Sequence, residues 1–301
     1  MNSLYLKIAS TSGDWTDEQW RQWDLCLVDH PSAYLDSRSI KAALDVDSRK
    51  LQAVMWVNSE GQTLGIAQVE DTHAMSQARG KFLKAEKPFF KLAQQYLYKG
   101  DGVFQFNVRV LGTVLSSGDH AYRFHESIST EERFVLIHQA LNIPMIDGSK
   151  PPLSSMVKDH YSDLPWHQKI AGKSNWHKSW IDLEFDPVME VDLNPEWKNF
   201  DQYSAALRKK SRTKIRRIMR GSEELILKNL TLEEVSDNAT KLHYLYKQVY
   251  DRAGFTLGHL NKEDLVSLKN QWGEDFPVIA YYLEDEIVGF QCGIVTEKTT
   301  E

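Results

Sequence analysis

Cysteine is nearly absent from this chain of 301 residues. Only Cys26 and Cys292 occur, and they lie far apart in the sequence. Two such residues cannot form a disulfide framework, and no spacing of Cys and His matches a structural zinc site. The sequence therefore gives no reason to expect a disulfide or a bound metal ion.

Long apolar runs and a net positive charge are also lacking. The first residues, MNSLYLKIASTSGDW, have neither a basic start nor a continuous apolar stretch, so no signal peptide is expected. No run approaches the length of a membrane-spanning helix. The net charge of −6 excludes a global field that attracts nucleic acid. These absences predict a cytoplasmic protein without a membrane span.

Aromatic side chains, by contrast, are plentiful. The chain has nine Trp, twelve Tyr and twelve Phe, with 42% hydrophobic and 26% charged residues. Such side chains bury enough apolar surface to offset the entropy lost on folding, which argues against disorder. A chain of this length is expected to form two domains of ordinary size, each with its own core.

One pattern occurs twice. The run VMWVNSEGQTLGIAQV at 54–69 is matched without a gap, 224 positions later, by VIAYYLEDEIVGFQCG at 278–293. Each copy has a β-rich run, an acidic turn and a second apolar run with a glycine at the same place, Gly65 or Gly289. Two hairpins of one kind predict two copies of one domain.

Further helices and strands are expected around these hairpins. Capping residues and apolar positions three or four residues apart predict helices at 14–28 and 129–141. Further helices are expected at 37–44, 199–219, 233–252 and 262–270, and one helix or a pair of short ones at 81–98. Alternating or β-branched runs predict strands at 103–114, 189–193 and 225–230. The faces expected to be buried are Trp20, Trp23 and Leu27 in the first helix, and Phe134, Ile137, His138 and Leu141 in the fourth.

Residues 144–180 differ in character from the rest of the chain. They contain Pro144, Pro151, Pro152 and Pro165 together with several Gly, Ser and His residues. A loop this long inside one domain is unusual, so a domain boundary is expected there. The predicted organisation is an N-terminal domain at 1–145, a connector at 146–180 and a C-terminal domain at 181–301.

The helix expected at 199–219 has the strongest local bias in composition. Between Arg208 and Arg220, eight of thirteen residues are Lys or Arg and none is acidic. Three interpretations stay open: a solvated face or a set of partners for the chain's acidic residues, a site for a phosphate-bearing ligand or tRNA, and a contact with a membrane surface. An apolar stripe at helical spacing is expected to pack on the core, and comprises Tyr203, Leu207, Ser211, Ile215, Ile218 and Met219.

The order of elements from Trp180 onward is informative. WIDLEFDPVMEVDLNPEW is followed by the basic helix and then by a strand, helices and the closing hairpin. This order resembles the FemAB-like group of the GNAT acyltransferase superfamily, in which a "k-x-R-x-x-i-R-r" helix precedes a GNAT-type unit. The matching residues here are Lys210, Arg212, Ile215 and Arg216. The first half resembles the N-terminal GNAT-like domain of such tandem proteins. The residues that carry this resemblance are Trp15, Trp23, the hairpin with Gly65, and the stretch 103–124 with Gly112 and Gly118.

The resemblance implies an α/β (α+β) fold with two GNAT-like domains. Each would have a twisted, mainly antiparallel sheet flanked by helices, and the N-terminal one would be degenerate. It also implies an N-acyltransferase that moves an acyl group from acetyl-CoA or another acyl-CoA to an amine of a small or cell-envelope-related acceptor. Fem-type relatives use aminoacyl-tRNA, so a tRNA-dependent transferase is one alternative. A non-catalytic GNAT-like binding module is another.

The pyrophosphate loop of that superfamily, Q/R-x-x-G-x-G/A, is not found. Gly100-Asp101-Gly102 follows Leu97, where Gln or Arg is required, and precedes a strand. The equivalent place in the first half, Ser116–His120, has one glycine and an aspartate that opposes a pyrophosphate. In the second half the place lies beyond Glu301. We therefore expect the C-terminal domain to lack its last strands and phosphate loop, as a fragment or as a chain completed by a partner.

Transfer to an amine requires a base and a proton donor for the leaving thiolate. Tyrosine suits these roles, and the candidates in the second half are Tyr246, Tyr250, Tyr281 and Tyr282. The candidates for binding substrate or phosphate are Arg208, Lys210, Arg212, Arg216 and Arg252. No cofactor-binding residue is assignable.

Other side chains gather near the expected connector without forming a recognisable site. The histidines are His120, His125, His160, His167 and His177, and they have no zinc spacing. Trp166, Trp176, Trp180 and Trp197 are expected to pack between the domains or to line a groove.

Overall fold

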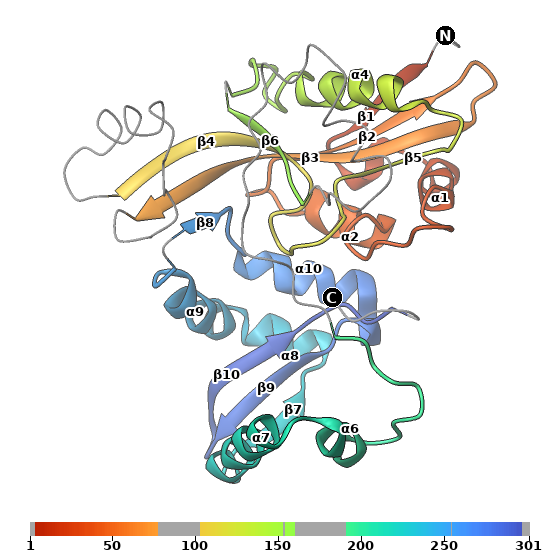
Figure 1. The fold of residues 1–301 in the computed structure, drawn as a ribbon. Coiled ribbons are helices and arrows are strands. Elements are labelled where there is room, and N and C mark those ends of the chain that lie inside the picture. The colour runs from red at the N-terminus through yellow and green to blue at the C-terminus, as the bar shows by residue number, and fades with distance from the viewer. Residues whose placement is uncertain (1–3, 78–102, 153, 160–190, 254, 297–301) are drawn as a thin grey trace, which may run out of the picture.

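The computed structural model describes residues 4–77, 103–152, 154–159, 191–253 and 255–296. Over these residues the protein is mixed α/β, with mainly antiparallel strands in two sheets and eight α-helices (Figure 1). The fold class expected from the sequence is confirmed at that level of detail. The helix predicted at 81–98 lies outside the described residues.

The first sheet has seven strands. Five follow the order β1-β2-β3-β4-β6, while β5 and β8 pair with other parts of the long strand β3. Every pair is antiparallel except β4 with β6. The strands are β1 (Tyr5–Ala9), β2 (Leu51–Val57), β3 (Thr63–Gln77), β4 (Val103–Leu111), β5 (Tyr122–Phe124), β6 (Ser155–Val157) and β8 (Phe255–Leu257).

The helices beside this sheet begin at capping residues, and for the first and the last of them such residues were predicted. Thr16, Asp36 and Ser129 each accept a hydrogen bond from a backbone N–H of the first turn that follows. Such bonds satisfy donors that the start of a helix leaves unpaired. The helices are α1 (Asp17–Leu25), α2 (Ser37–Leu44) and α4 (Thr130–Leu141), and a short 3-10 helix, η1 (Ser12–Asp14), precedes α1.

Strand β2 lies in the core, and all seven of its residues are buried. Met55 belongs to the apolar cluster on one face of the sheet, together with Trp23 of α1. Trp56 belongs to the cluster on the other face, together with Ile137 of α4. Because side chains alternate along a strand, a strand covered on both faces carries apolar residues at successive positions, which explains the apolar run at 53–57.

The buried face of α4 differs from the prediction. Leu136, Ile137, Ala140 and Leu141 are buried, whereas His138 is exposed. The periodicity of the helix was recognisable from the sequence, but the sheet that it packs against sets which side faces inward.

The second sheet has the order β10-β9-β7, and all its pairs are antiparallel. Its strands are β7 (Ile226–Asn229), β9 (Val278–Leu283) and β10 (Glu286–Cys292). Val278, Ala280 and Ile287 are buried in one cluster with residues of three helices, α8 (Leu232–Asp237), α9 (Ala239–Tyr250) and α10 (Lys262–Trp272). The short 3-10 helix η4 (Gly273–Asp275) joins α10 to β9.

Two predictions for the second half need correction. The helix predicted at 233–252 is divided into α8 and α9 at Asn238, whose side-chain amide donates to the carbonyl of Glu234 at 2.8 Å. Asparagine competes for backbone groups in this way and so favours helix ends over interiors. Residues 191–193 take no regular secondary structure, so the strand predicted at 189–193 is wrong over its described part.

The two hairpins predicted from the repeat are both present, and they share a local irregularity. In each, the register shifts just before the glycine, so that Leu64 in β3 and Val288 in β10 have no partner in the facing strand. Gly65 then faces Trp56, while Gly289 faces Tyr281. The stretch between the glycine and the residue that it faces is therefore one residue longer in the first hairpin, 57–64, than in the second, 282–288. The matching of the repeat without a gap is wrong by one position in the first strand of the hairpins.

The two halves of the chain are more closely joined than two domains linked by a connector. Strand β6 lies within the predicted connector and β8 within the predicted C-terminal domain, yet both belong to the first sheet. Helix α10 packs on α2, where Trp272 Nε1 donates to Ser39 Oγ at 2.9 Å and Ser267 Oγ to the Ala42 carbonyl at 2.8 Å. Residue 153 and residues 160–190 of the boundary region lie outside the described part of the chain.

Candidate anion-binding surface

The basic segment forms two helices and not the single helix predicted at 199–219. They are α6 (Phe200–Ala206) and α7 (Lys209–Gly221). Leu207 and Arg208 between them have extended backbone, with ψ of 155° and 146°. Arg212 spans the break, since its Nη1 donates to the carbonyl of Ala205 at 2.8 Å and so satisfies an acceptor at the end of α6.

Helix α7 does not pack its apolar stripe on the core, so that prediction is wrong. No residue of the helix is buried, and Ile218 and Met219 are 55% and 54% exposed. Ile215 is half-buried. In Figure 1, α7 lies at the far end of the second sheet from the first half of the molecule.

The eight cations between Arg208 and Arg220 surround most of α7. Seven are exposed and Arg212 is half-buried, and none forms an ion pair within the part of the chain that the structure describes. At about 100° per residue, the cations from Lys209 onward cover roughly 200° of the helix circumference. The exposed cations agree with a solvated face, whereas the other form of the first interpretation, pairing with acidic residues of the same chain, is not seen among the described residues.

Four of the five predicted phosphate-binding residues lie on this surface. Arg208 stands at the start of α7 without a capping hydrogen bond from its side chain, and Lys210, Arg212 and Arg216 lie within the helix. Arg252 is exposed but follows α9, which lies away from α7 in Figure 1. The structure does not bring Arg252 to the other four.

An aromatic group that the sequence did not reveal adjoins the basic helix. Trp197 and Phe200 both lie against Tyr203 of α6, with ring centroids 5.3 and 5.9 Å apart. Trp197 thus packs locally rather than between two domains. The other members of the predicted tryptophan patch, Trp166, Trp176 and Trp180, lie outside the described residues.

The candidate tyrosines do not join the cationic surface. Tyr250 donates to the carbonyl of Gly258 at 2.9 Å, and Tyr246 accepts from the N–H of Leu260 at 3.1 Å. Burial raises the pKa of Tyr246. Both hydroxyls therefore hold the segment between β8 and α10, which is a structural use of these groups.

The remaining two tyrosines lie on the second sheet. Tyr281 is half-buried and faces Gly289, and Tyr282 packs against the cluster beneath the helices. Neither makes a contact that marks it as a base or a proton donor.

The loop Ser116–His120, where the resemblance leads one to expect a pyrophosphate loop, makes contacts within the protein. The N–H of Gly118 donates to a carboxylate oxygen of Asp159 at 2.9 Å, and Lys158 forms an ion pair with the same carboxylate. Asp119 pairs with Arg123 at 3.3 Å. Asp159 therefore takes the backbone N–H of Gly118 and the ammonium group of Lys158 as partners within the protein.

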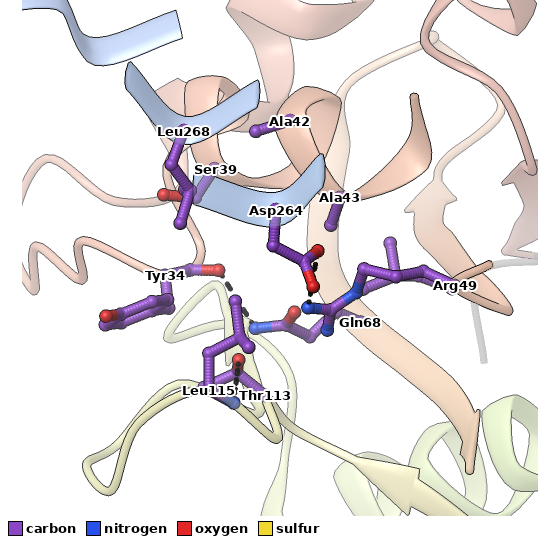
Figure 2. A pocket seen from close by; sticks show the side chains of 11 residues that line it. Tyr34, Ser39, Ala42, Ala43, Arg49, Gln68, Thr113, Leu115, Asp264 and Leu268 are labelled. Atoms are coloured by element: carbon purple, nitrogen blue, oxygen red, sulfur yellow. Dashed lines mark hydrogen bonds and ion pairs between the residues drawn. The ribbon is translucent and has the colours of Figure 1, made fainter. Parts of the chain in front are cut away.

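A small cavity lies between the two halves, and Figure 2 shows its lining. Arg49 and Asp264 form an ion pair at one side, and the Gln68 amide donates to the Tyr34 carbonyl at 3.0 Å. The cavity measures about 10 Å³, which suffices for about one water molecule and not for a cofactor.

An open groove of about 800 Å³ lies between the end of α2 and the helices α8, α9 and α10. Its lining includes the carboxylates of Asp45, Glu233 and Glu263 and the ammonium group of Lys262. The groove contains neither the cations of α7 nor the candidate tyrosines, so it does not correspond to the predicted site.

Searches for related proteins and for other kinds of site were negative. No protein-family model matches the chain, and no curated protein matches it. Among the described residues, no group of three or more His, Cys, Asp and Glu side chains is placed to hold a metal ion. No helix in the same part of the chain has the length and apolarity needed to cross a bilayer.

Proposed function

We propose that this protein is a GNAT-like N-acyltransferase whose helix α7 binds the phosphate groups of a substrate or of its carrier. The acyl group would come from acetyl-CoA or another acyl-CoA and pass to an amine of a small or cell-envelope-related acceptor. The observation that carries the proposal is the exposed helix with eight cations and no ion-pair partner among the described residues.

Electrostatics favours a polyanion on this helix. Neighbouring cations at i,i+4, such as Arg208, Arg212 and Arg216, repel one another and weaken the helix slightly. Phosphate groups would replace this repulsion by charge-assisted hydrogen bonds, and arginine would bind them with two parallel N–H groups. The binding would weaken as salt is added, because exposed charges are screened.

The length of α7 favours one alternative, an aminoacyl-tRNA-dependent transferase of Fem type. Thirteen residues span about 20 Å at 1.5 Å per residue, and cations occur along the whole helix. An RNA backbone presents phosphates over that distance, whereas coenzyme A carries only a pyrophosphate and one further phosphate. The closed loop at Gly118 favours a second alternative, a non-catalytic GNAT-like binding module.

The test compares ligand binding by the wild type and by the double variant Lys210→Glu/Arg216→Glu. The side chains of Lys210 and Arg216 form no described hydrogen bond, so their replacement breaks none. Acyl-CoA binding is measured by calorimetry and tRNA binding by filter retention. Lys50→Glu/Lys150→Glu is the matched control, since both of these lysines are exposed cations of the first half without a described ion pair.

We expect the α7 variant to bind its ligand at least about tenfold more weakly than the wild type and the control. Heat with acyl-CoA supports the acyl-CoA-dependent enzyme, and binding of tRNA alone supports the Fem-type transferase. If the α7 variant binds both acyl-CoA and tRNA as the wild type does, the helix holds the phosphate groups of neither of these two ligands. No heat with any acyl-CoA and no binding of tRNA contradicts the proposed function.

A further inference from the structure

Helix α7 has two distinct sides, and both are open to solvent. Ile215, Ile218 and Met219 share one side of the helix at 100° per residue. The cations from Lys209 to Arg220 occupy the rest of the circumference. A soluble polyanion would neutralise the cations but would leave the apolar side in contact with water.

Exposed apolar residues continue beyond the helix. Strand β7 begins five residues after the last residue of α7, and its Ile226 and Leu227 are 65% and 58% exposed. Leu227 lies opposite Tyr281, on the face of the second sheet that points away from the helices. Phe200 of α6 is also half exposed. This segment thus presents apolar and aromatic side chains together with an excess of positive charge.

We infer that α6 and α7 lie on the surface of an anionic lipid bilayer. Lipid headgroups offer phosphates to the cations, and the acyl-chain boundary immediately below them accepts Ile218 and Met219. The aromatic group of Trp197, Phe200 and Tyr203 suits the headgroup level, where amphipathic rings are favoured. Because cations and apolar side chains occur together on one exposed helix, a bilayer fits this surface better than a soluble polyanion does.

This inference rests on the proposed function and makes it more specific, because it identifies the phosphate groups bound by α7 as those of lipid headgroups. A protein held there would act on an amine at the membrane surface. Its acyl donor would bind elsewhere, so charge reversal on α7 should leave donor binding intact.

The experiment is co-sedimentation of the full chain with phosphatidylcholine vesicles that contain or lack phosphatidylglycerol. The variants are Ile218→Ser/Met219→Ser, which removes the apolar side, and Lys210→Glu/Arg216→Glu, which reverses two charges. Val28→Ser/Val249→Ser is the matched control, because these valines are 66% and 73% exposed at other sites. Circular dichroism checks that each variant is folded.

We expect the wild type and the control to sediment with the anionic vesicles only. Each α7 variant should bind them at least about tenfold more weakly. The inference is overturned if the wild type stays in solution, or if Ile218→Ser/Met219→Ser binds vesicles like the wild type. It is also overturned if the α7 cations bind tRNA but not vesicles.

Acyl-CoA calorimetry on the same samples separates this inference from the proposed function. Vesicle binding without any heat from acyl-CoA supports the membrane contact and contradicts the acyl-CoA-dependent enzyme. Heat from acyl-CoA without vesicle binding contradicts the membrane contact and supports the enzyme.

Discussion

His120 illustrates how burial changes the chemistry of a single side chain. Its Nδ1 lies 2.7 Å from Ser32 Oγ, and its ring centroid lies 5.2 Å from that of Tyr34. Burial lowers the pKa of His120 to about 4, and the nearby cations of Arg123 and Lys158 act in the same direction, against Asp159. The imidazole is therefore neutral in the folded protein at pH 7.

This pKa predicts that acid destabilises the fold through His120. The folded pKa of about 4 lies below the value of 6.5 for an unperturbed histidine, so the unfolded chain binds a proton that the folded chain excludes. The contribution of neutral His120 to the free energy of unfolding is fully present above pH 6.5. It is lost as the pH is lowered toward 4, by up to about 3 kcal/mol at 1.36 kcal/mol per unit of pKa.

The measurement is urea unfolding of the wild type and of His120→Gln across this range. Glutamine keeps a polar group near Ser32 but does not titrate. The free energy of unfolding should fall less steeply with acid in the variant. Equal slopes in the two proteins would show that His120 does not govern the effect.

The two hairpins allow a comparison at the scale of the element. A Cβ atom added to Gly65 would lie 2.5 Å from Phe124 Cδ1 and 3.1 Å from Trp56 Cε3. A Cβ atom added to Gly289 would lie 3.8 Å from Tyr281 Cδ2, an ordinary contact. Strand β5 covers the first hairpin with its phenylalanine, and the equivalent part of the second hairpin carries no such ring.

We therefore predict opposite tolerance to alanine at these equivalent positions. Gly65→Ala should lower the free energy of unfolding by about 1–3 kcal/mol, the usual cost of overfilling a packed core. Gly289→Ala should change it by about 0.5 kcal/mol or less. Chemical unfolding of both variants gives the comparison, and a larger loss in Gly289→Ala would contradict the described packing.

Whether the apolar side of a helix is buried likewise depends on the elements that surround it. The caps of α1 and α4 and the turn after β2 could be predicted, because each involves residues only a few positions apart. The stripe on α7 is as periodic as the buried face of α1, yet it stays exposed. Periodicity shows that a helix has an apolar side, and only the arrangement of other elements determines what covers it.

At the scale of the whole molecule, Arg49 joins the two halves. Its Nη2 lies 2.6 Å from Glu70 in β3, and its Nη1 lies 3.2 Å from Asp264 in α10. The Arg49 side chain is only 3% exposed, and the side chains of Glu70 and Asp264 are similarly buried. Removing the cation would leave two buried carboxylates close together without their partner.

Arg49→Met should therefore lower the free energy of unfolding by about 3–5 kcal/mol. The matched control is Arg21→Met, since Arg21 pairs with Glu18 at 2.7 Å but is 61% exposed, and its loss should lower the free energy of unfolding far less. Denaturant unfolding followed by tryptophan fluorescence measures both. A loss in Arg49→Met no greater than in the control would contradict a role for this ion pair in joining the halves.

The same contacts predict how the wild type unfolds. Because β8, α2 and α10 link the two sheets, the described halves should unfold in one cooperative transition, whereas two domains on a connector would give two. The sequence predicted two domains on a connector, because contacts such as that between Arg49 and Asp264 join residues 215 positions apart and leave no local pattern.

By itself, the sequence determined the features that depend on neighbouring residues. These are the mixed α/β class, the capped helices, the repeated hairpin and the concentration of positive charge between Arg208 and Arg220. Tertiary structure alone decided which apolar faces are covered, that β6 and β8 complete the first sheet, and that the N–H of Gly118 is held by Asp159. It also decided that α7 stays in solvent with its cations unpaired among the described residues. The physical reason is that capping and periodicity act over a few residues, whereas burial and ion pairing depend on groups brought together from distant parts of the chain.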